Sequence, residues 1–184
     1  MMKSKNKNKK IKTVKYVSNI LMTEPFTDYT KPIFWLSKRI NIDKSMYLYY
    51  QCPGGHMEKE EDQLACLYRE TTEETLIFKE HLRDVNYEFT CLYDQQVANR
   101  DSGKRVVYVY TSITSIQPKV SQDEQINMTA WQLYSLRDIV LLKVIDILGE
   151  YILQLINNQQ EQLLLFYGTE IIMMNGKFIQ DLVQ

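Results

Sequence analysis

The chain has 184 residues, of which 45% are hydrophobic and 24% charged, as in a globular protein with one sizeable core. It contains no apolar run long enough to span a membrane, and its three cysteines and two histidines show neither disulfide-framework nor zinc-ligand spacing. The net charge of −1 is uneven, because residues 1–12 hold six lysines and no acidic residue. We therefore expect a cytoplasmic or nuclear protein whose residues 1–12 form a disordered basic tail or an arm that contacts RNA.

Alternating and apolar segments predict the strands of a sheet around one central helix. Strands are expected at residues 13–24, 32–40, 46–52, 86–93 and 105–116. The helix is expected from Asp62 to Thr75, soon after a Pro-Gly-Gly turn at residues 53–55. The turn-rich residues 99–104 predict a long hairpin loop between the last two strands.

The remainder of the chain predicts a second long helix and a hairpin. Asp138 can cap a helix that runs to about Asn158, with apolar side chains recurring at helical spacing. These side chains, which predict a stripe facing the core or an interface, are Ile145, Leu148, Ile152 and Leu155. Short strands and a two-residue turn are expected at 163–166, 171–174, 175–176 and 177–179. Residues 159–184 are thus predicted to be an extension whose hairpin closes an edge of the sheet or forms a homodimer contact.

The helix after the Pro-Gly-Gly turn carries acidic residues at a fixed spacing. Residues three and four apart share one side of a helix, so Glu70, Glu73 and Glu74 converge on one face. Crowded carboxylates repel each other unless a cation neutralises them, and a hard divalent ion such as Mg²⁺ prefers these oxygen ligands. A solvated acidic surface helix is the alternative. The preceding glycine turn and the single Arg69 among the carboxylates favour the metal site.

The whole stretch resembles the Nudix box, in which a glycine, a glutamate, an Arg-Glu pair and a Glu-Glu pair follow one another at fixed distances. The matching residues are Gly55, Glu61, Arg69, Glu70, Glu73, Glu74 and Ile77. Thr71 stands where an apolar residue is usual, and Leu76 where a glycine is usual. Because glycine lets a helix stop in a left-handed conformation, Leu76 predicts a helix that overruns or ends by another route. The resemblance implies a Nudix α/β/α sandwich with a mixed β-sheet over residues 13–158.

The resemblance also implies roles for individual residues. Mg²⁺, for which Mn²⁺ could substitute, would be held by the carboxylates of Glu70, Glu73 and Glu74 and the backbone carbonyl of Gly54. Arg69 would pair with Glu61 and fix the geometry of the helix, instead of forming an ordinary surface ion pair. The general base would be a glutamate of the box or a loop acid, for which Glu124 is the leading candidate, with Asp123 beside it. The substrate would be contacted by Arg39, Gly55 and His56. An exposed strand-end charge and a structural histidine are the plainer interpretations of the first and last of these.

Nudix enzymes cleave a nucleoside diphosphate linked to another group, so the resemblance implies a pyrophosphohydrolase. Residues 54–58 (Gly-Gly-His-Met-Glu) and 69–71 (Arg-Glu-Thr) look like the variant of some (deoxy)nucleoside triphosphate diphosphatases, which release a monophosphate and pyrophosphate. Removal of an mRNA cap, with the basic arm gripping RNA, is the alternative. A catalytically silent domain that binds a nucleotide or a protein is a third interpretation. Aromatic residues that could stack a base, or else fill the core, are Trp35, Tyr47, Tyr49, Tyr50 and Trp131.

Overall fold

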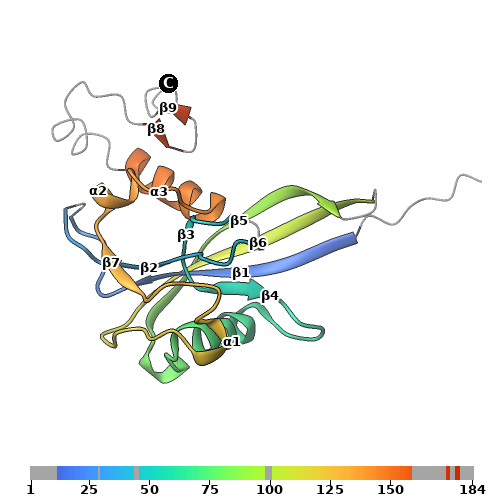
Figure 1. Ribbon diagram of the computed structural model, residues 1–184, viewed down its shortest axis with the longest axis horizontal. Coiled ribbons are helices and arrows are strands. Elements are labelled where there is room, and N and C mark those ends of the chain that lie inside the picture. Colours follow the sequence, from blue (N-terminus) through green and yellow to red (C-terminus); the bar gives the residue numbers. More distant parts are fainter. Residues whose placement is uncertain are drawn as a thin grey trace, which may run out of the picture.

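A mixed β-sheet between two layers of helices forms the body of the protein (Figure 1). The computed structural model describes residues 12–28, 30–43, 46–97, 101–158, 173–174 and 177–178. One face of the sheet is covered by α1 (Gln63–Thr75), and the other by α2 (Leu136–Ile139) and α3 (Asp146–Asn158). This arrangement confirms the predicted α/β/α sandwich with a mixed sheet.

The sheet is built outward from its central strand, β1 (Lys12–Met22). On one side, β6 (Asp101–Ile113) runs parallel to β1 along its whole length. β5 (Arg83–Val97) then pairs antiparallel with β6. A parallel pair next to an antiparallel pair makes the sheet mixed.

Short strands on the other side of β1 bring the glycine turn to the middle of the sheet. β4 (Gly54–His56) and β2 (Phe34–Lys38) pair antiparallel with successive parts of β1. β3 (Tyr50–Gln51) and β7 (Gln132–Tyr134) in turn pair with β2. The turn at Gly54 therefore lies against the central strand and is fixed by backbone hydrogen bonds.

The two faces of β1 supply the cores under the two helical layers, because successive side chains of a strand point to opposite faces. Val17 packs with Leu67 of α1 in one buried cluster. Ile20 packs on the opposite face with Leu148 and Ile152 of α3. These two residues of α3 belong to the stripe predicted from the sequence, and both are completely buried.

Two predicted boundaries are wrong because the backbone departs from the sequence pattern. The strand predicted at 46–52 is reduced to β3, since Met46 and Leu48 have φ angles of 60° and 67°, which a strand does not accommodate. The loop predicted at 99–104 is wrong from Asp101 onward, because β6 already begins there and pairs with β5.

The helix predicted from Asp138 to Asn158 is in fact two helices. Ser135, not Asp138, is the N-cap of α2: its hydroxyl accepts the backbone N–H of Asp138 at 3.1 Å, and the Asp138 carboxylate accepts the N–H of Ser135 at 2.9 Å. The chain leaves the helix before α3 because Val144, which is 1% exposed, forms a β-bridge with Tyr50. A tertiary contact thus interrupts a continuous helical pattern.

The C-terminal strands form a sheet of their own. β8 (Met173–Met174) pairs antiparallel with β9 (Lys177–Phe178), as predicted, but neither strand extends the main sheet within the described residues. The predicted turn at 175–176, the predicted strand at 163–166 and tail residues 1–11 lie outside the described residues. Across the described part of the chain, no helix combines the length and apolar character needed to cross a membrane.

Candidate active site

The Pro-Gly-Gly turn occupies the narrow space between β1 and α1. A Cβ atom on Gly54 would overlap the backbone carbonyl of Val17, and the φ of Gly54, 154°, is rarely adopted by residues with side chains. A Cβ atom on Gly55 would overlap the carboxylate of Glu70 on α1. Backbone packing therefore requires glycine at position 54, whereas a side chain at position 55 would displace the Glu70 carboxylate.

Arg69 is the centre of a hydrogen-bonded network that ties α1 to the residues before it. Its guanidinium donates two bonds to Glu61, at 2.9 and 3.0 Å, and so forms the ion pair expected from the sequence. It also donates to Glu70 at 2.8 Å, to Glu73 at 3.2 Å and to the backbone carbonyl of His56 at 2.8 Å. The bonds from Arg69 lower the pKa of Glu61 to about 2. One cation thus organises three carboxylates.

Glu74 is the acid of α1 that turns toward the glycine strand. The backbone N–H of Gly54 donates to its carboxylate at 3.1 Å. Burial raises the pKa of Glu74 to about 8; the charges of Glu70 and Glu124 raise it further, whereas the Gly54 bond and the charge of Arg39 lower it. Burial also raises the pKa of Glu70. These acids are therefore held where burial disfavours their ionised forms.

The positions of the helix carboxylates test the predicted metal site. Within the described residues, no three acidic, histidine or cysteine side chains gather into a group that could hold a metal ion. Arg69 keeps Glu70 and Glu73 at its own side, while Glu74 faces Gly54. The donor chemistry nevertheless fits a hard divalent cation, because the raised pKa values mark oxygen ligands whose negative charge such a cation would neutralise.

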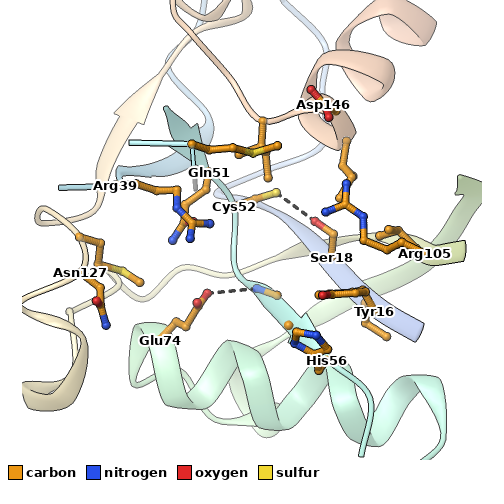
Figure 2. A pocket seen from close by; sticks show the side chains of 18 of the residues that line it. Tyr16, Ser18, Arg39, Gln51, Cys52, His56, Glu74, Arg105, Asn127 and Asp146 are labelled. Atoms are coloured by element: carbon orange, nitrogen blue, oxygen red, sulfur yellow. Dashed lines mark hydrogen bonds between the residues drawn. The ribbon is translucent and has the colours of Figure 1, made fainter. Parts of the chain in front are cut away.

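A cavity of about 360 Å³ opens beside Glu74 (Figure 2). Arg39, which directly follows β2, lines it and donates a hydrogen bond to Gln51 at 3.0 Å. Glu124 lines it from η2 (Gln122–Glu124) and accepts a bond from the side chain of Asn127 at 2.9 Å. The fold thus brings a loop acid and an arginine, which are far apart in the sequence, to the same cavity as Glu74.

The cavity gathers only part of the predicted site. The predicted residues that line it are Arg39, Gly54, Gly55, His56, Glu74 and Glu124. The predicted residues that belong instead to the Arg69 network are Glu61, Arg69, Glu70 and Glu73. Asp123 is exposed and is not among the lining residues.

One end of the cavity is formed by residues that the sequence did not single out. Arg105 of β6 stacks over the rings of Tyr93 and Tyr16, with its guanidinium carbon 4.7 and 5.6 Å from the two ring centroids. The ring of Tyr16 lies 3.9 Å from that of His56, and Asp146 at the start of α3 lines the same end (Figure 2). Burial, followed by the charge of Arg105, lowers the pKa of His56. No local motif marks this group, because separate strands and a helix bring it together.

The two tryptophans that could have stacked a base belong to the core. Trp35 and Trp131 are 8% and 2% exposed. The indole N–H of Trp131 donates to the backbone carbonyl of Glu74 at 3.1 Å. Trp131 therefore supports the end of α1 and is not available for stacking in the cavity.

Leu76 ends α1 in a left-handed conformation, so the expectation that the helix overruns is wrong. The helix stops at Thr75, and Leu76 has φ 57° and ψ 23°, with its N–H bonded to the carbonyl of Thr72. This conformation is strained for leucine, whose side chain remains 47% exposed. Ile77, the next residue, is only 1% exposed, in a cluster with Trp131. The chain must turn at Leu76 for Ile77 to be buried, and the burial of Ile77 offsets the strain at Leu76.

Replacing Leu76 with glycine is expected to stabilise the protein by about 1 kcal/mol, because glycine adopts a positive φ without a steric penalty. Chemical denaturation measures the change in the free energy of unfolding, and we expect catalysis to tolerate the substitution. Leu76→Ala is the control, since it shortens the side chain but keeps the Cβ atom that causes the strain. A glycine variant no more stable than the alanine variant would show that Leu76 is not strained.

Comparison with known proteins identifies the family. The fold and the glycine turn against an acidic helix are those expected for a hydrolase of phosphorus-containing anhydrides. The sequence model of the NUDIX domain matches residues 17–156, so the chain belongs to the Nudix hydrolase family. Members of this family act on small nucleotide substrates and generally need a divalent metal ion. No curated protein matched the chain in sequence.

Solved structures have the same fold at low sequence identity. An Ap4A hydrolase from C. elegans, in a binary complex, has a TM-score of 0.55 at 18% identity, covering 80% of this chain and 98% of that one. The NUDIX domain of NrtR from Shewanella oneidensis, complexed with ADP ribose, has a TM-score of 0.56 at 19% identity, covering 84% of this chain and 90% of that one. A MutT protein from Methanosarcina mazei has a TM-score of 0.57 at 15% identity, covering 82% of this chain and 97% of that one. At such identities the likeness shows the fold alone.

Proposed function

We propose that the protein is a Mg²⁺-dependent pyrophosphohydrolase that cleaves a (deoxy)nucleoside triphosphate into a monophosphate and pyrophosphate. The observation that carries the proposal is Glu74, an enclosed carboxylate that lines a cavity beside the glycine turn, with the acids Glu70 and Glu124 nearby. The chain keeps every charged position of the Nudix box, which favours catalysis over a domain that only binds. A cavity of about 360 Å³ also suits a small-molecule nucleotide.

In this proposal Mg²⁺, or Mn²⁺ in its place, is held by the carboxylates of Glu70, Glu73 and Glu74 and the backbone carbonyl of Gly54. A bound divalent cation supplies charge neutralisation at the phosphate oxygens. The contribution of the chain is to supply these acids from one helix, next to the glycine turn. Arg69 holds Glu70 and Glu73, and the N–H of Gly54 holds Glu74.

Glu124 is the proposed general base. It lines the same cavity as Glu74, and its charge raises the pKa of Glu74, as expected for two acids close together. The side chain of Asn127 holds one of its oxygens at 2.9 Å, and the other can accept a proton from the attacking water. Glu74 is the alternative base.

The two arginines of the cavity suggest how the substrate lies in it. Arg39 is proposed to contact phosphate oxygens, for which a planar guanidinium with several donors is well suited. Arg105, with the rings of Tyr16 and His56, is proposed to contact the nucleoside, because aromatic and guanidinium faces stack on nucleobases. Glu74, which lines the same cavity (Figure 2), would then lie beside the polyphosphate.

Product analysis over a panel of substrates tests this function. The panel contains nucleoside and deoxynucleoside triphosphates, a dinucleoside polyphosphate, ADP-ribose and capped RNA, each with Mg²⁺ and with EDTA. We expect triphosphates to give a monophosphate and pyrophosphate, resolved by chromatography and phosphorus NMR, and EDTA to abolish the reaction. Release of single phosphates, or turnover restricted to the other members of the panel, would contradict the proposal.

Deleting residues 1–11 separates triphosphate hydrolysis from mRNA decapping. Lys12 is kept because it is the first residue of β1. A small triphosphate that binds in the cavity needs no contact with the basic arm. We therefore expect the deletion to change the rate of triphosphate hydrolysis by no more than about twofold relative to the full chain. A twofold change corresponds to less free energy than one hydrogen bond contributes. If capped RNA is instead the substrate, and the deletion makes cap release weaker and less sensitive to salt, decapping replaces the proposed function.

A further inference from the structure

Three buried polar side chains join α1 to the two central strands. Asn19 of β1 donates its side-chain N–H to the hydroxyl of Thr71 on α1 at 2.9 Å. Ser112 of β6 donates its hydroxyl to the side-chain oxygen of Asn19 at 2.8 Å. None of the three is more than 1% exposed. Because buried polar groups are costly unless they are paired, these bonds select one arrangement of helix and strands.

Asn19 also holds the glycine turn through its backbone. Its N–H donates to the carbonyl of Pro53 at 2.8 Å, and the preceding Ser18 lies opposite Gly54 in the pairing of β1 with β4. Asn19 therefore contacts both the turn that carries Gly54 and the helix that carries Glu74. The groups of these two elements meet in the hydrogen bond from the Gly54 N–H to the Glu74 carboxylate.

Thr71 accounts for one departure of the chain from the Nudix box, which usually has an apolar residue at this position. Thr71 is fully buried like an apolar residue, yet its hydroxyl accepts the bond from Asn19. Apolar packing has no preferred direction, whereas a hydrogen bond prefers a fixed length and angle. Thr71 precedes Glu74 by less than one helical turn, so its bond restricts rotation and sliding of α1 close to Glu74.

We propose that Asn19 is a positioning residue for the acidic helix. Its bond to Thr71 sets the rotation of α1 against the glycine turn and so keeps Glu74 within hydrogen-bond distance of Gly54. Asn19 needs no contact with the substrate for this role. The inference rests on the proposed function where hydrolysis or metal binding is the readout, whereas exchange of the Gly54 amide tests it separately.

Substitutions at both ends of the bond test this role. Thr71→Val has nearly the shape of threonine but lacks the hydroxyl, Thr71→Ser keeps the hydroxyl, and Asn19→Leu removes the amide. For Thr71→Val and Asn19→Leu we expect about tenfold weaker Mn²⁺ binding and about tenfold lower kcat, with KM within about twofold. Thr71→Ser is expected to remain close to wild type. The double variant Asn19→Leu/Thr71→Val should lose no more Mn²⁺ binding and kcat than the more impaired single variant, because both substitutions remove the bond between Asn19 and Thr71.

Two control variants separate positioning from general stability. Ser112→Ala removes the bond on the far side of Asn19, so we expect its Mn²⁺ binding to stay within about twofold of wild type. Ile152→Val loosens the core under α3 and is expected to leave Mn²⁺ binding unchanged despite its lower stability. Exchange of the Gly54 amide, followed by NMR, reports directly on the bond to Glu74. It is expected to become about tenfold faster in Thr71→Val and to stay unchanged in Ser112→Ala.

Electron paramagnetic resonance of Mn²⁺ without nucleotide distinguishes this inference from the proposed function. If the wild type binds Mn²⁺ but hydrolyses no triphosphate, the proposed function fails, while weaker Mn²⁺ binding by Thr71→Val still supports the positioning role. Unchanged Mn²⁺ binding and unchanged exchange of the Gly54 amide in Thr71→Val and Asn19→Leu would overturn the positioning role of Asn19. Additive losses in the double variant, or a Thr71→Ser variant as impaired as Thr71→Val, would overturn it as well.

Discussion

Glu74→Gln is expected to lower the rate of hydrolysis by at least about 10²-fold, because charge stabilisation at the reacting phosphate is a leading catalytic contribution. Glutamine keeps the shape of glutamate, and its carbonyl can still accept the bond from the Gly54 N–H. The substitution replaces an enclosed carboxyl that is costly to ionise, so we expect the metal-free variant to unfold at a temperature at least as high as wild type. Initial rates at saturating Mg²⁺ and thermal unfolding followed by circular dichroism measure the two effects.

An acid outside the site provides the control for this substitution. Glu60→Gln removes an equal charge from an exposed position whose salt-bridge partner is Lys59, and we expect it to leave the rate unchanged. If Mg²⁺ is held by the acids of α1, it should raise the unfolding temperature of wild type more than that of Glu74→Gln. Wild-type turnover by Glu74→Gln would show that Glu74 is not part of the active site. Full activity in EDTA would show that the reaction needs no metal ion.

Arg69→Met is expected to lower the free energy of unfolding by about 3 kcal/mol and the rate by at least about tenfold. The substitution leaves Glu61, Glu70 and Glu73 close together without the guanidinium that bonds all three. The rate falls because the carboxylates that are proposed to hold the metal ion lose their common anchor. Urea denaturation and initial rates measure the two losses.

The double variant Glu61→Gln/Arg69→Met is the matched control. It removes the carboxylate that accepts two bonds from Arg69, so we expect it to be less destabilised than Arg69→Met alone. The pH dependence provides a further check. Because the pKa of Glu61 is lowered to about 2, the ion pair contributes fully above the ordinary glutamate pKa near 4.5 and is lost as the pH falls toward 2. Stability should therefore fall less steeply over this interval in Arg69→Met than in wild type.

Local sequence patterns were sufficient to predict the acidic helix and its partners. Asp62 acts as the N-cap of α1, which covers Gln63–Thr75 within the segment predicted as a helix, although Leu76 predicted a different end. The resemblance to the Nudix box implied the ion pair between Glu61 and Arg69, which the structure contains. The positions of the acids within α1 depend on residues close in sequence, because residues three and four apart share one side of a helix. The periodicity of each segment indicated the strands and helices, and the resemblance to the Nudix family implied the α/β/α layers that they form.

Contacts between distant segments decided the rest. Leu76 takes a left-handed conformation because Ile77 must reach the core, which outweighs the preference of leucine for a continued helix. Thr71 is a weak fit to the Nudix box until the fold places Asn19 opposite it. The cavity end around Arg105 has no local signature, since it forms only when strands far apart in sequence pair in one register. The sequence by itself therefore determined the family, the acidic helix and its ion pair. The tertiary structure decided which acids face the cavity and what holds them there, because burial and hydrogen bonding depend on neighbours that no local pattern specifies.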